Sequence, residues 1–99
     1  MGACDFSVFK KGADASKAFR SAVDDARYAD GHGGYSGTIA EKSSFQIIQH
    51  APVTMEEARK IVDSKIEEND KWGPAFALPV KKKEGSEIEG WVFFGFASS

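Results

Sequence analysis

Two stretches of this 99-residue chain repeat their apolar residues at the three-and-four spacing of a helix, and strand-like stretches surround both. Asp14 precedes the first stretch and can act as its N-cap. Thr54, with Glu57 three residues later, predicts a capping box at the start of the second, and Val53 can pack on Ala58 as a hydrophobic staple. The predicted apolar stripes are Ala15, Ala18, Phe19, Ala22, Val23 and Ala26 in the first helix, and Met55, Ala58, Ile61, Val62 and Ile66 in the second. Each stripe has to be buried against another element.

The segments around these helices have strand character. Residues 4–10, CDFSVFK, alternate in hydrophobicity and end at Gly12. We predict a hairpin from residues 35–41 and 45–49, and a second hairpin from residues 75–83 and 88–96 with its turn at residues 84–86. The order predicts an α+β domain of the ferredoxin-like split βαβ type (β-α-β-β-α-β-β), in which an antiparallel sheet carries two helices on one face. We expect residues 1–99 to form a single domain, because a core of this size cannot be divided.

The predicted sheet assigns its two faces different roles. Phe6, Val8, Phe76, Leu78, Val92, Phe94 and Phe96 would pack against the helices. Trp91 and Phe93 are in the opposite phase of the last strand, so we expect them on an uncovered face, where they could contact a partner. Pro79 cannot donate to a strand ladder, which predicts either an edge strand or an edge-facing position for its nitrogen.

The most glycine-rich stretch, DGHGGYSG at residues 30–37, follows the first helix. Gly31 is placed to end that helix in the left-handed conformation. One glycine suffices for a cap, so the others indicate a close approach of another backbone or a ligand. Candidate binding residues in this stretch are His32, Gly33, Gly34, Tyr35, Ser36 and Thr38. The spacing is not that of a phosphate-binding loop, because a helix precedes the glycines instead of following them.

The sequence gives weaker indications of a catalytic site, a metal site or an aromatic anchor residue. His32 with Ser36 or Glu41 contains the residue types of nucleophilic catalysis, but no nucleophile-elbow sequence accompanies them. Cys4, His32 and His50 have no metal-ligand spacing, so we expect neither a metal nor another cofactor. Trp72 is either a core residue under its loop or an aromatic anchor for a partner, and it joins the candidate binding residues.

Topology decides whether the glycine stretch and the Trp72 loop can cooperate. If residues 35–49 form two strands, the helices run in opposite directions and the two loops lie at opposite ends of the sheet. If they form one strand, both loops meet at one end and could place His32, Tyr35, Asp70 and Trp72 around a pocket. We favour the hairpin, which makes a shared active site unfavourable.

The composition of the chain argues against nucleic acid and membranes as binding partners. Thirteen basic and 15 acidic residues give a net charge of −2, which supplies no broad positive field for nucleic acid. The single cysteine cannot form an internal disulfide and suits a reducing cytoplasm. The sequence contains neither a long apolar run nor a signal peptide pattern, so we expect a cytoplasmic protein that does not enter a membrane.

The stretches DARYADGHGGYSGTIAEKSSF and DKWGPA resemble a group of small uncharacterised open reading frames of bacterial and phage genomes. The resemblance implies that both loops are family features and leaves the origin of the chain open between a bacterium and a phage, and it implies no activity. We therefore expect a cytoplasmic, non-catalytic binding or regulatory protein that acts through protein contacts. If the chain is phage-encoded, we expect it to modulate a host system in the host cytoplasm. A homodimer is left open, and the alternative is a small enzyme or ligand-binding protein that uses His32, Tyr35 and Ser36.

Overall fold

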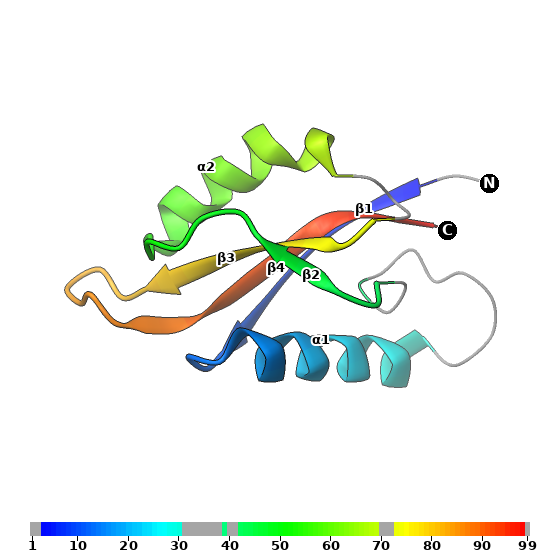
Figure 1. Cartoon of the computed structure of the whole chain (residues 1–99), viewed down its shortest axis with the longest axis horizontal. Coiled ribbons are helices and arrows are strands. Elements are labelled where there is room, and N and C mark those ends of the chain that lie inside the picture. Colours follow the sequence, from blue (N-terminus) through cyan, green and yellow to red (C-terminus); the bar gives the residue numbers. More distant parts are fainter. Residues whose placement is uncertain (1–2, 31–38, 40–41, 70–72, 99) are drawn as a thin grey trace.

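A computed structural model describes residues 3–30, 39, 42–69 and 73–98. In it, a four-stranded sheet lies between two helices, one on each side (Figure 1). Along the chain, the elements are β1 (Ala3–Lys11), α1 (Ala15–Asp30), β2 (Phe45–Ile47), α2 (Met55–Lys65), a 3₁₀ turn η2 (Ile66–Glu68), β3 (Ala75–Lys81) and β4 (Ile88–Ser98). The predicted mixture of helices and strands is confirmed, including both helices and the hairpin between β3 and β4.

The strand order is β1-β4-β3-β2, and the sheet is mixed. Strand β4 runs antiparallel to both β1 and β3, whereas β2 runs parallel to β3. The prediction of an antiparallel sheet is therefore wrong, and the ferredoxin-like order is not confirmed. The physical reason is that α2 carries the chain from the end of β2 back to the start of β3, and such a crossover produces parallel neighbours.

The two helices cover opposite faces of the sheet, so the prediction of both helices on one face is also wrong. Trp91, Phe93 and Ala97 of β4 pack in the core under α1, whereas Val92 and Phe94 pack in the core under α2. A strand that is apolar in both phases is typical of a sheet covered on both sides. The continuous run WVFF was the signal for this arrangement.

The core under α1 contains the predicted helical stripe and aromatic rings from β1, α1, β2 and β4. Phe19 of α1 lies 5.0 Å from Phe45 and 5.4 Å from Phe93 between ring centroids. Such tilted and edge-on ring pairs add about 0.5–1.5 kcal/mol each beyond their buried area. At the start of α1, Asp14 accepts a hydrogen bond from the N–H of Lys17 at 3.2 Å, which confirms the predicted N-cap.

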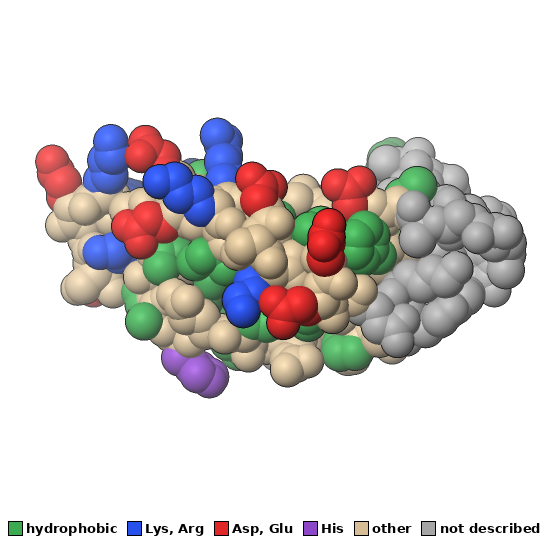
Figure 2. Space-filling view, turned by 90° about the horizontal axis from the view of Figure 1, so that it is seen from above, with side chains coloured by type: hydrophobic (Ala, Val, Ile, Leu, Met, Phe, Trp, Pro, Cys, Tyr) green, Lys and Arg blue, Asp and Glu red, His purple; other side chains and the backbone are tan. Residues whose placement is uncertain are grey.

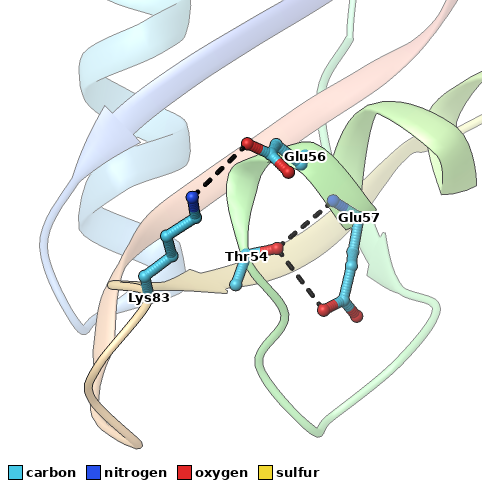
Figure 3. Close-up of polar contacts among 4 residues, drawn as sticks. All are labelled: Thr54, Glu56, Glu57 and Lys83. Atoms are coloured by element: carbon cyan, nitrogen blue, oxygen red, sulfur yellow. Dashed lines mark hydrogen bonds and ion pairs between the residues drawn. The ribbon is translucent and has the colours of Figure 1, made fainter.

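The core under α2 contains the whole predicted stripe of that helix. Thr54 is its N-cap and accepts a hydrogen bond from the N–H of Glu57 at 3.3 Å (Figure 3). Val53 and Ala58 are both buried in this core, as the predicted staple requires. Sequence signals local to the helix therefore predicted its start correctly.

Pro79 lies in an interior strand, because β3 is flanked by β4 and β2. Its neighbours show which way its nitrogen points: the N–H of Ile48 binds the carbonyl of Ala77, and the N–H of Val53 binds the carbonyl of Pro79. The proline nitrogen faces the same side, beyond the last β2 residue, Ile47. The predicted edge strand is wrong, and the proline nitrogen lies between the end of β2 and the parallel bridge from Val53 to Val80, where the ladder between β2 and β3 is interrupted.

Candidate functional site

Most of the predicted binding residues lie outside the described residues. These are His32, Gly33, Gly34, Tyr35, Ser36, Thr38 and Trp72, together with the predicted helix cap Gly31. The prediction of a strand over residues 35–41 falls in the same region, apart from Ile39, which is buried in the core under α1.

The described residues that flank these segments lie at one end of the molecule. Both helices run in the same direction, and α1 and η2 end on the side where the two chain termini lie (Figure 1). The favoured prediction of helices running in opposite directions is wrong. The alternative, with one strand between the helices, describes the fold better, because β2 is the strand the structure describes there and it runs parallel to β3.

A buried polar cluster joins the chain segments at this end. Lys42 and Asn69 are only 3% and 8% exposed. The ammonium group of Lys42 donates to Asn69 Oδ1 at 3.3 Å and to the carbonyl of Gly73 at 2.9 Å. Asn69 Nδ2 donates to the carbonyl of Pro74 at 2.8 Å, and Asn69 Oδ1 accepts from the N–H of Phe96 at 2.9 Å. Because buried polar groups are costly unless they are satisfied, this network fixes how the segments before β2 and β3 meet β4.

Gly95 provides the room for that network. Its φ is +153°, and a Cβ built on it would lie 2.3 Å from Asn69 Oδ1. A side chain at this position would displace the asparagine from the backbone of β4. The glycine is therefore required both by its backbone conformation and by the close approach of Asn69.

Trp91 and Phe93 do not form the uncovered aromatic face that we predicted. Trp91 is 5% exposed and donates its indole N–H to the carbonyl of Ala13 at 3.1 Å, and Phe93 is fully buried. The prediction failed because α1 covers the face of the sheet onto which these rings project, whereas both helices had been expected on the other face. Neither ring is available to a partner in this fold.

The outer edge of β1 is a surface that sequence reasoning missed. Among the described residues, β1 pairs with β4 on one side and with no strand on the other. The N–H of Gly12 binds the carbonyl of Glu89 at 2.9 Å, which continues the β1–β4 register and sets the phase of the ladder. Hydrogen-bonded pairs alternate along an antiparallel ladder. The backbone groups that point away from β4 are therefore those of Ala3, Asp5, Ser7, Phe9 and Lys11.

A groove of about 500 Å³ runs between this strand and α2. Its apolar wall includes Phe9 of β1, Met55 and Val62 of α2, Ile66 of η2, and Val92 of β4. Phe9 is half-buried because its ring lies over Gly90, where a Cβ would come within 2.7 Å of the ring. The groove therefore offers apolar surface directly beside backbone groups of β1 that pair with no strand among the described residues.

Charged side chains border the groove. Asp5 from β1 and Arg59 and Asp63 from α2 line it and are exposed. The space-filling view toward the α2 side shows apolar patches among acidic and basic side chains (Figure 2). An apolar center with a charged border is typical of surfaces that bind other polypeptides.

Sequence signals for these features existed in part. The β1 residues Asp5, Ser7 and Phe9 were visible as the second phase of the strand, but an edge position follows only from the strand order. Lys42 and Asn69 gave no signal, because their burial depends on chain segments far apart in sequence. Among the described residues, there is no group of three or more His, Cys, Asp or Glu that could hold a metal ion.

Comparisons with protein-family models, with curated proteins and with solved structures find no match. In the described part of the chain, no helix combines the length and hydrophobicity needed to cross a membrane. Candidate functions therefore rest on the geometry of the site.

Proposed function

We propose that this chain is a non-catalytic binding protein that acts through protein contacts, and that the outer edge of β1 with the adjoining groove is its contact surface. The observation that carries the proposal is the juxtaposition of an open edge of a nine-residue strand with a groove walled by Phe9, Met55 and Val62. In strand addition, the backbone of an extended polypeptide supplies the hydrogen bonds, and its alternate side chains fill neighbouring pockets.

The chemistry of the surface favours a polypeptide over a small molecule. The groove lies beside a strand edge and is bordered by exposed charges, whereas small-molecule sites enclose most of their ligand. An extended segment would place every second side chain toward α2 and η2, where Met55, Val62 and Ile66 accept apolar groups. Asp5 and Asp63 would select against acidic residues at the border of the groove.

Ser7→Pro tests this function. The N–H of Ser7 points away from β4, so proline removes a donor from the outer edge without removing a β1–β4 hydrogen bond. Peptides selected against the wild-type protein from a displayed library should bind in an extended form and lose at least about tenfold in affinity for the variant, measured by titration calorimetry. The control Lys60→Ala, on the exposed side of α2, should keep the wild-type affinity.

Amide exchange provides the second measurement. A bound strand should slow exchange of the outward amides of Asp5, Ser7 and Phe9 while leaving those of Val8 and Lys10 unchanged, because the latter already bind β4. Selected peptides that bind Ser7→Pro as tightly as wild type and protect other amides would contradict the proposal.

A ligand-binding site or small enzyme at the other candidate location is the second proposal. The observation that favours it is that Lys42, Asn69 and Gly73, which flank the glycine stretch and the Trp72 loop, are joined at one end of the fold. His32→Ala and Ser36→Ala separate the two proposals. A catalytic site would lose turnover in these variants with protein binding retained, whereas the β1 surface predicts wild-type peptide binding in both.

A further inference from the structure

Alternate residues of β1 direct their backbone N–H and C=O groups away from β4, and this alternation restricts the register in which another strand can pair with the open edge. Its outward backbone groups belong to Ala3, Asp5, Ser7, Phe9 and Lys11, all odd-numbered. If a second copy pairs with it in antiparallel fashion, hydrogen-bonded pairs have to join odd-numbered residues of both copies. The numbers of two opposite residues then add to an even total, and the dyad passes through one residue of β1.

Charge selects one of these registers. With the dyad at Val8, Asp5 of each copy lies opposite Lys11 of the other, and this ion pair occurs twice by symmetry. With the dyad at Ser7, Asp5 lies opposite Phe9 and Lys11 opposite Ala3, which leaves both charges unpaired. A dyad at Phe6 places Asp5 opposite Ser7. A dyad at Phe9 places Lys11 opposite Ser7. The Val8 register is the one of these four that matches opposite charges.

The same register suits the remaining positions. Ser7 of each copy lies opposite Phe9 of the other, and the half-buried Val8 lies opposite its symmetry mate. Residues directly opposite each other in a sheet project to the same face. Asp5, Ser7 and Phe9 of both copies would therefore project to the α2 side, where the two grooves would adjoin.

We propose that the polypeptide that pairs with β1 is a second copy of this chain, joined in an antiparallel β1–β1 ladder with its dyad at Val8. The inference rests on the proposed function of the β1 edge as a protein contact surface, and it names the partner. The sheet then continues through both copies, and each copy covers the open edge of the other, which removes an exposed template for nonspecific strand pairing.

Complementary charge reversals test the register directly. Asp5→Lys places a lysine opposite the Lys11 of the second copy, and Lys11→Glu places a glutamate opposite its Asp5. Each single variant should dimerise at least about tenfold more weakly than wild type, because two attractive pairs become repulsive. The equimolar mixture of the two variants should recover the wild-type dimer, since a lysine of one variant then faces an acidic residue of the other at both contacts. Lys60→Glu, on the exposed side of α2, is the charge-reversal control and should dimerise as wild type does.

Sedimentation velocity and equilibrium measurements on the full chain, from about 1 µM to about 1 mM, give the association constants. Ser7→Pro should abolish the dimer. A wild-type protein that is monomeric throughout the range would overturn the inference. A dimer indifferent to Ser7→Pro would place its interface elsewhere and would also overturn it, as would a mixture that fails to recover the dimer.

The outcomes distinguish this inference from the proposed function. If wild type is monomeric but selected peptides bind in a manner that depends on Ser7, the contact surface stands and the second copy is wrong as its occupant. If neither peptides nor a second copy depend on Ser7, both proposals fail.

Discussion

Gly95 and Asn69 make a contact in which a single methyl group would matter. Position 95 combines a φ of +153° with a Cβ that would lie 2.3 Å from Asn69 Oδ1, Gly12 has a φ of +126° with open space around it, and Gly85 has neither constraint. We expect Gly95→Ala to lower the free energy of unfolding by about 3 kcal/mol, Gly12→Ala by about 1–2 kcal/mol and Gly85→Ala by less than about 0.5 kcal/mol. Urea denaturation measures the order, and equal effects at positions 95 and 12 would contradict the role of Asn69.

Asn69 itself satisfies three groups with one amide. Its truncation removes an acceptor of the Lys42 ammonium and of the Phe96 N–H, and the donor to Pro74. We expect Asn69→Ala to destabilise the fold by about 2–4 kcal/mol, because these groups stay buried. Gln49→Ala is the matched control: its amide makes an exposed bond to Ala51 at 2.9 Å, so its removal should change stability by less than about 0.5 kcal/mol. Chemical denaturation of both variants decides the comparison.

At the scale of elements, the start of α2 shows two kinds of polar contact side by side (Figure 3). Thr54 caps the helix, whereas the ion pair between Glu56 and Lys83 spans 3.8 Å between two exposed side chains. We expect Thr54→Ala to cost about 1 kcal/mol, with Thr54→Ser close to wild type, because serine retains the capping oxygen. Lys83→Met should have no measurable effect, since exposed ion pairs contribute little. Thermal and urea unfolding measure the stability of the three variants. A larger loss for Lys83→Met than for Thr54→Ala would contradict this ranking.

The phase of β1 makes a second prediction at this scale. Proline at Val8 removes an N–H that binds β4, whereas proline at the neighbouring Ser7 removes one that points outward. We expect Val8→Pro to destabilise the monomer by at least about 2 kcal/mol and Ser7→Pro by less than about 1 kcal/mol. Urea titrations at low protein concentration measure the difference without a contribution from association. Equal losses would show that the assigned ladder phase is wrong.

For the whole molecule, the central fact is that two cores share one sheet. Phe93 and Phe94 are adjacent in β4 and both fully buried, yet they belong to cores on opposite faces. We expect Phe93→Ala and Phe94→Ala each to lower stability by about 3–5 kcal/mol and to leave a single unfolding transition. Tryptophan fluorescence and far-ultraviolet circular dichroism should report the same midpoint. Separate midpoints would mean that the two layers unfold independently.

The local elements of this fold could be predicted from sequence because their causes lie within a few residues. The stripes of α1 and α2, the caps Asp14 and Thr54 and the hairpin turn between β3 and β4 depend on neighbours in the chain. The layering was mispredicted because Trp91 and Phe93 were assigned to an open face by analogy with a two-layer fold. Their continuity with Val92 and Phe94 indicated burial on both sides.

The candidate site was less accessible to sequence reasoning. The predicted binding residues from His32 to Thr38, with Trp72, lie outside the described residues, so their role stays a prediction. The β1 edge could not be predicted because an edge is a property of strand order. Lys42 and Asn69 could not be predicted as a pair because their contact spans 27 residues of sequence.

The amino-acid sequence alone determined where the two helices begin, which stripe of each helix is apolar, and that residues 75–81 and 88–98 form a hairpin, because periodicity, capping and turn chemistry act over a few residues. Tertiary structure alone decided that α1 and α2 lie on opposite faces, that β2 runs parallel to β3, and that β1 keeps an open edge beside a groove. Those outcomes depend on which distant segments compete to pair and pack, and the free energy of that competition is not contained in any single segment.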